Sequence, residues 1–111
     1  MSSLQSHKGE LGVVVVAAGF SERMGGVDKM RYKLLGKPVL SYSLSIFNEC
    51  PLVEEVVLVV SKDNLAWATS LIKELDYKKV VAIVEGGERR QDSVRLGMSC
   101  LRKSCWVLVH D

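Results

Sequence analysis

The clearest chemical signal in the sequence is a glycine-rich segment that follows a run of valines. It reads Ala17-Ala18-Gly19-Phe20-Ser21-Glu22-Arg23-Met24-Gly25-Gly26, with Lys29 shortly beyond. The small residues Ala17, Ala18 and Gly19 allow a ligand to approach the main chain closely. Successive main-chain N–H groups in such a turn can form an anion-binding concavity. Arg23 and Lys29 could then neutralise a triphosphate, so the spacing predicts a phosphate-binding loop.

This loop matches neither of the two commonest phosphate motifs. It lacks the G-x-G-x-x-G spacing of a dinucleotide fold and the G-x-x-x-x-G-K-[ST] of a P-loop. The alternative interpretation is a surface loop whose charges are solvated. The spacing alone leaves both interpretations open.

A second segment pairs two glycines with the start of a helical pattern, and reads Gly86-Gly87-Glu88-Arg89-Arg90-Gln91-Asp92-Ser93. Main-chain donors near the helix start, together with the Ser93 hydroxyl, could hold a base edge or a ribose. In the simpler alternative, Asp92 or Ser93 is only a helix cap and the arginines are solvated.

The third segment is His110-Asp111, at the end of an apolar run. An aspartate beside a triphosphate suits Mg²⁺, which proteins usually hold with one or two carboxylates plus substrate phosphates. The alternative is two polar residues without a ligand. If Asp111 is the last residue, its α-carboxylate adds a second negative charge there. We expect His110 to be structural or to support the site rather than to bind metal.

Four apolar, valine-rich runs alternate with helical patterns along the chain. The strands are expected at Leu11–Ala17, Glu55–Val60, Lys79–Val84 and Trp106–Val109. Gly19 to Arg31 is expected to be a loop. Helices are expected from Pro38 to about Asn48, after a cap at Asp63 or Asn64, and from about Gln91 to Arg102, with Val94, Met98 and Leu101 facing inward.

This alternation predicts an α/β fold of the Rossmann-like type. It favours a mostly parallel sheet with right-handed crossovers and helices on both faces, which is a three-layer sandwich. Ligands bind such sheets outside the carboxyl ends of the strands. Because all three segments above lie at such ends, we expect them to form one site.

Length and composition restrict the remaining possibilities. The chain has 111 residues and a net charge of +2, which is too weak to indicate nucleic acid. Its longest apolar run, Val13 to Ala18, is too short for a membrane span, which needs about 20 residues. The three cysteines lack metal-site spacing, so free and mostly buried thiols in a reducing compartment are expected.

The ends of the chain give two further expectations. Residues 1–10 are polar and are expected to be a disordered leader before a domain at residues 11–111. The chain stops after a strand that looks buried, so we expect a C-terminally truncated piece of a longer domain. The weaker alternative is a complete small domain with an exposed edge, which natural sheets tend to avoid.

Taken together, the motifs resemble a known enzyme family. Ala17-Ala18-Gly19-Phe20-x-x-Arg23-Met24-Gly25, Lys29 and Gly36-Lys37-Pro38-Val39-Leu40 resemble nucleotidyltransferases built on a glycosyltransferase-A-like sheet. Gly86-Gly87-x-x-Arg90-Gln91-Asp92-Ser93-Val94-x-x-Gly97, with Val107-Leu108-Val109-His110-Asp111, is similar to 2-C-methyl-D-erythritol 4-phosphate cytidylyltransferases of the non-mevalonate isoprenoid pathway. The resemblance runs from about Leu11 to the last residue.

The resemblance implies a reaction and roles for matched residues. CMP would pass from CTP to 2-C-methyl-D-erythritol 4-phosphate, a sugar-alcohol phosphate, with release of pyrophosphate. Arg23 and Lys29 would be catalytic, Asp111 would bind Mg²⁺, and six residues would contact the nucleotide, namely Ala17, Ala18, Gly19, Gly87, Glu88 and Ser93. The whole protein could form a homodimer in the cytoplasm, or in the plastid stroma of a plant or alga. Neither nucleic acid nor membrane is an expected partner.

Departures from the family pattern keep alternatives open. The family often has proline where Val16 and Asp28 stand, and the loop is about one residue short, so Lys33 is a rival for the role of Lys29. Past Asp111 the family motif continues with Ala-Ala-Arg-Pro. A ribitol 5-phosphate or molybdenum-cofactor transferase, a non-catalytic CTP-binding domain and an inert fragment are the alternatives. We expect the 111 residues alone to turn over weakly or not at all.

Overall fold

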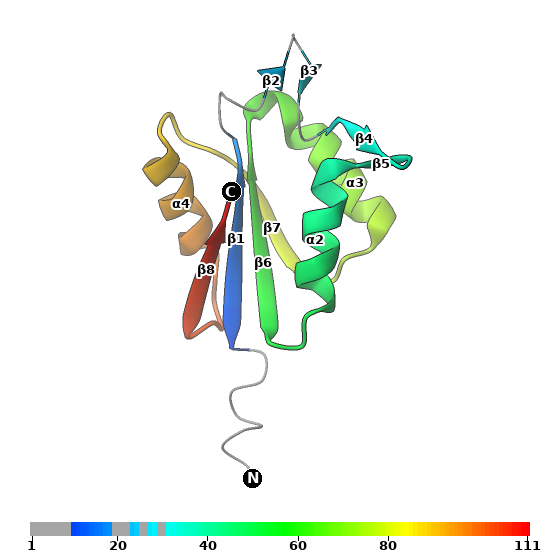
Figure 1. The fold of residues 1–111 in the computed structure, drawn as a ribbon. Helices are drawn as coiled ribbons and strands as arrows, with labels where there is room; N and C mark the ends of the chain where they lie inside the picture. The colour runs from blue at the N-terminus through cyan, green and yellow to red at the C-terminus, as the bar shows by residue number, and fades with distance from the viewer. Residues whose placement is uncertain (1–9, 19–22, 25–26, 29–30) are drawn as a thin grey trace.

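A four-stranded parallel sheet forms the centre of the computed structural model, which describes residues 10–18, 23–24, 27–28 and 31–111. Its strands are β1 (Leu11–Ala17), β6 (Val53–Val60), β7 (Val80–Glu85) and β8 (Trp106–His110). They lie in the order β7-β6-β1-β8, and every neighbouring pair is parallel (Figure 1). The parallel sheet expected from the valine-rich runs is confirmed.

The strand order reverses beside β1. In chain order, β6 and then β7 are added on one side of β1, and β8 is added on the other side. In open α/β sheets such a reversal leaves a crevice outside the carboxyl ends of the strands, where ligands bind. Here that point lies between the ends of β1 and β8.

Helices cover both faces of this sheet. On one face lie α2 (Val39–Glu49) and α3 (Leu65–Leu75), and on the other lies α4 (Arg90–Ser99) (Figure 1). The side chains of β1 point alternately to the two faces of the sheet. Val13 and Val15 belong to the apolar cluster under α2 and α3. Val14 and Val16 belong to the cluster on the α4 side. The expected three-layer sandwich is therefore confirmed.

Short antiparallel pairs replace part of the loop expected at Gly19 to Arg31. Among the described residues, β2 (Arg23–Met24) pairs with β3 (Val27–Asp28). A second hairpin joins β4 (Lys33–Leu34) to β5 (Lys37–Pro38), with Leu35 and Gly36 both at positive φ, as a tight two-residue hairpin turn requires. Two-residue strands are too short to give an alternating pattern in the sequence.

Helix boundaries differ from the expectations in three places. Pro38 is the residue before α2 rather than its first residue. A 3₁₀ turn, η3 (Lys62–Asn64), precedes α3, and Asn64 occupies the cap position without a side-chain capping hydrogen bond. Helix α4 ends at Ser99 rather than near Arg102.

The inward face of α4 also differs from the expectation, since Met98 is 46% exposed. Gly97 takes the packed position instead, and a side chain there would meet Val14 and Val59. Cys50 and Cys100 are half-buried and Cys105 is exposed, so all three are free as expected but none is fully buried. The predicted leader lies almost entirely outside the described residues.

Candidate functional site

Gly86 brings two of the predicted segments together at the carboxyl end of the sheet. Its N–H donates to the carbonyl of Val60 at 2.8 Å, which extends the pairing of β7 with β6 by one residue. A Cβ atom on Gly86 would lie 2.7 Å from the Cβ of Ala18 and 2.6 Å from the Oγ of Ser93. The residue after β1 and the first turn of α4 therefore both pack against a position that only glycine fits.

Ser93 holds the turn that leads into α4. Ser93 is 2% exposed, and its hydroxyl accepts the N–H of Gly87 at 3.1 Å. Glu88, the next residue along, is exposed. The buried Ser93 hydroxyl thus fixes the main chain of Gly87, next to the exposed Glu88, at the carboxyl end of β7.

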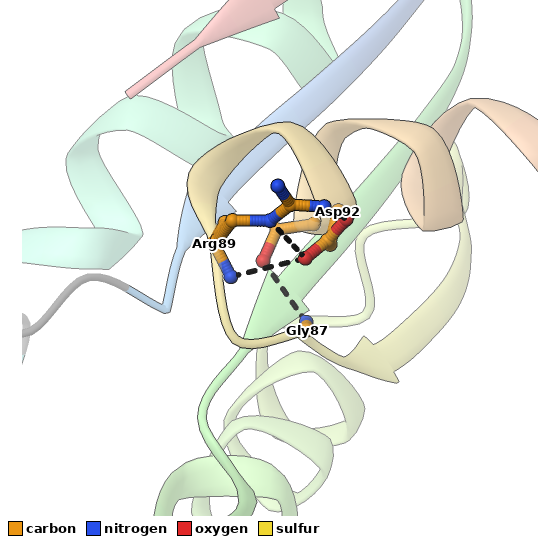
Figure 2. A network of polar contacts seen from close by, with 4 residues as sticks. Gly87, Arg89 and Asp92 are labelled. Atoms are coloured by element: carbon orange, nitrogen blue, oxygen red, sulfur yellow. Dashed lines mark hydrogen bonds and ion pairs between the residues drawn. The ribbon is translucent and has the colours of Figure 1, made fainter.

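Asp92 and Arg89 form a local ion pair in the same turn. The Asp92 carboxylate accepts the Arg89 N–H at 3.2 Å and its side-chain Nε at 3.1 Å (Figure 2). The hydrogen bond between the side chains raises the pKa of Arg89 and lowers the pKa of Asp92. Asp92 therefore has the capping role given as the simpler alternative, although its position is the third residue of α4.

Asp111 joins the third predicted segment to the second. Nε of Arg90 donates to both carboxylate oxygens of Asp111, at 3.0 Å each, and Nη2 of Arg90 donates to Oδ2 at 2.7 Å. Both side chains are 59% exposed. The hydrogen bond and the negative charge of Asp111 raise the pKa of Arg90. The first residue of α4 and the residue after β8 are thereby linked.

The first segment is described only in part. Ala17 is buried at the end of β1, and Ala18 is half-buried. Arg23 contributes its main chain to β2, opposite Asp28 of β3. Gly19 and Lys29 lie outside the described residues, so their roles stay predictions. The rival Lys33 is exposed on the β4–β5 hairpin, which projects beyond α2 and α3 (Figure 1).

The sequence indicates no role for Arg31 beyond the last position of the expected loop. Its Nε donates to the side-chain oxygen of Asn64 at 2.7 Å, and its Nη2 donates to the carbonyl of Asp63 at 3.1 Å. The guanidinium carbon also lies 4.9 Å from the centre of the Trp67 ring. Arg31 therefore fastens the end of the glycine-rich segment to the start of α3. Its partners lie about thirty residues away, which no local pattern reveals.

The described residues offer a divalent cation few protein ligands at this site, so phosphates and water would complete its shell. No group of three or more potential ligands occurs among the histidine, cysteine, aspartate and glutamate residues that the structure describes. Asp111 provides an exposed carboxylate beside the switch point. This donor set suits Mg²⁺, which is commonly held by one or two carboxylates and completes its shell with substrate phosphates and water.

The described part of the chain contains no helix with the length and apolar character that a membrane span requires.

Comparison with known proteins gives a consistent family assignment. The family model for 2-C-methyl-D-erythritol 4-phosphate cytidylyltransferase matches residues 11–111. A cytidylyltransferase of that name from Dehalococcoides mccartyi strain 195 is 51% identical over 102 residues, which cover 92% of this chain and 45% of the relative. A bifunctional enzyme IspD/IspF from Desulforudis audaxviator is 46% identical over 100 residues, covering 88% of this chain and 25% of the relative.

Solved structures share the fold. The 4-diphosphocytidyl-2C-methyl-D-erythritol synthase of Anaerococcus prevotii superimposes with a TM-score of 0.76 at 24% identity, over 93% of this chain and 43% of that one. The inositol-1-phosphate CTP transferase of T. maritima gives a TM-score of 0.68 at 23% identity, over 92% and 44%. This chain therefore spans less than half the length of the curated relatives and solved structures named here. Because the family model covers residues 11–111, the chain belongs to the 2-C-methyl-D-erythritol 4-phosphate cytidylyltransferase family.

Proposed function

We propose that the whole protein transfers CMP from CTP to 2-C-methyl-D-erythritol 4-phosphate and releases pyrophosphate. The observation that carries this proposal is the family match over residues 11–111. The meeting of three polar segments at the switch point of the sheet supports it independently, since that is where such folds bind ligands. We also propose that residues 11–111 form the N-terminal part of one cytidylyltransferase domain.

The proposed chemical step is an in-line displacement at phosphorus. An oxygen of the acceptor's phosphate attacks the α-phosphorus of CTP, forming one P–O bond while the bond to the β-phosphate oxygen breaks. The electron pair of the broken bond leaves with pyrophosphate. No protein nucleophile is required, so positioning and charge neutralisation account for the catalysis.

Each predicted site residue has a role in this proposal. The main chain of Ala17, Ala18 and Gly19 binds the nucleotide, while Arg23 and Lys29 neutralise the charge that develops on the triphosphate. Mg²⁺ held by Asp111 and the phosphates would supply further neutralisation.

The base and ribose of CTP are assigned to the second segment. Gly87 and Glu88 follow the carboxyl end of β7, and the buried Ser93 hydroxyl accepts the N–H of Gly87. A turn fixed in this way can present main-chain donors and acceptors in a constant arrangement, which specific recognition of a base edge requires. We propose that Gly87, Glu88 and Ser93 contact cytosine and ribose.

The proposal also covers the partners, the oligomeric state and the cellular compartment of the protein. Its partners would be CTP and a sugar-alcohol phosphate, and the whole protein would form a homodimer. Three free cysteines suit a reducing compartment, so we propose the cytoplasm, or the plastid stroma if the source is a plant or alga.

The test is pyrophosphate release by the whole protein with CTP, Mg²⁺ and the acceptor. Arg23→Ala should lower the rate about 10²- to 10³-fold, if its charge resembles one oxyanion donor. Arg102→Ala, which removes an exposed arginine beyond the far end of α4, is the matched control and should leave the rate unchanged. A panel with ribitol 5-phosphate tests the acceptor. CTP binding without turnover of any acceptor would overturn the proposed reaction.

A further inference from the structure

The two oxygens of Asp111 that a cation would need are already occupied by Arg90. Three donor–acceptor distances, all between 2.7 and 3.0 Å, place the guanidinium fork against the carboxylate. A metal ion that coordinates the carboxylate from the side on which the fork lies would compete with the guanidinium for the same lone pairs. Cation binding on that side of Asp111 must therefore displace Arg90, at least in part.

The ion pair between Arg90 and Asp111 can open at a small cost in free energy. Both side chains are 59% exposed, and an ion pair so open to water contributes little to stability because solvent screens it. A buried pair would leave an uncompensated charge on opening, whereas this one exchanges its contacts with water. Arg90 is also the first residue of α4, so it stays beside the crevice after Asp111 is released.

The neighbouring arginine does not share this position. Arg89 is bound to Asp92 within its own turn, through both its main chain and its guanidinium. The two adjacent residues thus have the same side chain and similar exposure, but only Arg90 contacts Asp111.

We propose that Arg90 is a positioning residue that exchanges partners when the nucleotide binds. It holds Asp111 at the crevice in the free protein. When a cation–triphosphate complex arrives, the carboxylate passes to the cation and the freed guanidinium turns to the phosphate oxygens. A guanidinium fork matches phosphate as well as it matches carboxylate, so both charges stay paired. This inference rests on the proposed function, because it assigns the cation to Asp111.

The first measurement is Mn²⁺ binding by the whole protein without nucleotide, followed by electron paramagnetic resonance. Arg90→Gln frees Asp111 and should tighten Mn²⁺ binding about two- to fivefold, as expected for removing an exposed ion pair. Arg89→Gln changes the net charge equally and should leave the affinity unchanged. Equal affinities in the two variants would overturn the exchange.

The second measurement is CTP binding by calorimetry in the presence of Mg²⁺. Arg90→Gln should weaken CTP binding about tenfold, since a charged contact to phosphate is lost. Arg90→Lys keeps the charge but not the fork and should fall between wild type and Arg90→Gln. Unchanged CTP affinity in Arg90→Gln would contradict the second half of the exchange.

Asp111→Asn separates this inference from the proposed function. If Asp111→Asn abolishes Mn²⁺ binding while Arg90→Gln and Arg89→Gln behave alike, the metal assignment stands and the exchange alone is wrong. If Asp111→Asn leaves Mn²⁺ binding unchanged, both the exchange and the metal assignment are wrong.

Discussion

The carboxylate of Glu55 accepts both the main-chain N–H and the hydroxyl of Ser104, at 3.0 and 2.7 Å, 49 residues further along the chain. It also accepts the main-chain N–H groups of Arg102 and Lys103. Glu55 is 3% exposed on β6. Its carboxylate thus fills a concavity of three successive amides and fastens the turn between α4 and β8 to the sheet.

This contact lies at the opposite end of the sheet from the candidate site, yet it bears on Asp111. The turn that Glu55 holds leads directly into β8, where Trp106 pairs with Leu11 of β1. Since residues along paired strands keep a constant register, fixing the start of β8 also fixes where it ends. We therefore expect Glu55 to stabilise both the fold and the position of Asp111.

Glu55→Gln should destabilise the protein by about 2 kcal/mol. The amide group retains one acceptor oxygen but turns a donor toward N–H groups, which leaves buried donors without a partner. The measurement is the free energy of unfolding in urea. Glu54→Gln, at the adjacent residue outside this hydrogen-bonded cluster, is the control. A loss in Glu54→Gln as large as that in Glu55→Gln would show that the cluster is not the cause.

The same carboxylate makes stability depend on pH. Burial raises the pKa of Glu55, but the hydrogen bonds from Ser104, Arg102 and Lys103 together outweigh burial and hold the pKa below its ordinary value. The unfolded chain then binds the proton more tightly, so this stabilisation is present above the ordinary carboxyl pKa of about 4.3. It is lost as the pH falls through the folded pKa.

Urea unfolding of wild type and Glu55→Gln between pH 7 and pH 3 measures this dependence. The difference in unfolding free energy between the two proteins should shrink toward the acid end. A constant difference across the range would contradict the lowered pKa of Glu55 in the folded protein.

Gly86→Ala should damage the candidate site directly. The added methyl group would meet Ser93 Oγ at 2.6 Å and Ala18 Cβ at 2.7 Å, so the end of β1 and the start of α4 must separate. We expect CTP binding to weaken at least tenfold and stability to fall by about 1–3 kcal/mol, as overpacking typically costs.

The control for Gly86→Ala is Gly36→Asn. No atom of the residues that the structure describes lies within 4 Å of a Cβ on Gly36, and asparagine tolerates its positive φ of 83° better than other side chains. Calorimetry with CTP and Mg²⁺ should show little change in this variant. Wild-type CTP affinity in Gly86→Ala would show that the approach of β1 and α4 does not matter for binding.

Arg31→Ala should weaken CTP binding through the loop that precedes it. The substitution removes the hydrogen bond to Asn64 and the stacking on Trp67, which hold the end of the glycine-rich segment. We expect the affinity for CTP to fall about five- to tenfold, which corresponds to the free energy of one or two such contacts.

A double-mutant cycle with Asn64→Ala checks the cause. If Arg31 acts through Asn64, the double variant should lose less CTP affinity than the two single losses combined. Fully additive losses would mean that Arg31 and Asn64 act separately.

The order of strands and helices could be predicted because each strand is an apolar, valine-rich run. Strands β1 and β6 are buried on both faces, whereas β7 and β8 stay partly exposed. The two-residue strands around Arg23 and Lys33 could not be predicted, since they contain no repeat to detect. Helical spacing alone places Met98 in the core. Gly97 packs closely against Val14 instead, and Met98 is 46% exposed.

The site was predictable in its location but not in its contacts. Strand ends follow from the strand pattern, so the meeting of Ala18, Gly86 and Asp111 at one edge could be expected. The pairing of Arg90 with Asp111 and of Arg31 with Asn64 depends on side chains that are 21 and 33 residues apart. Such pairs are set by the three-dimensional arrangement of the strands and leave no local signature.

The most direct test of the account is a crystal structure of the whole protein with CTP and Mg²⁺. The triphosphate should lie against the main chain of residues 17–19, with cytosine beside Gly87 and Ser93 and the cation on Asp111. A nucleotide bound away from the carboxyl ends of β1 and β8, with that crevice empty, would contradict the account.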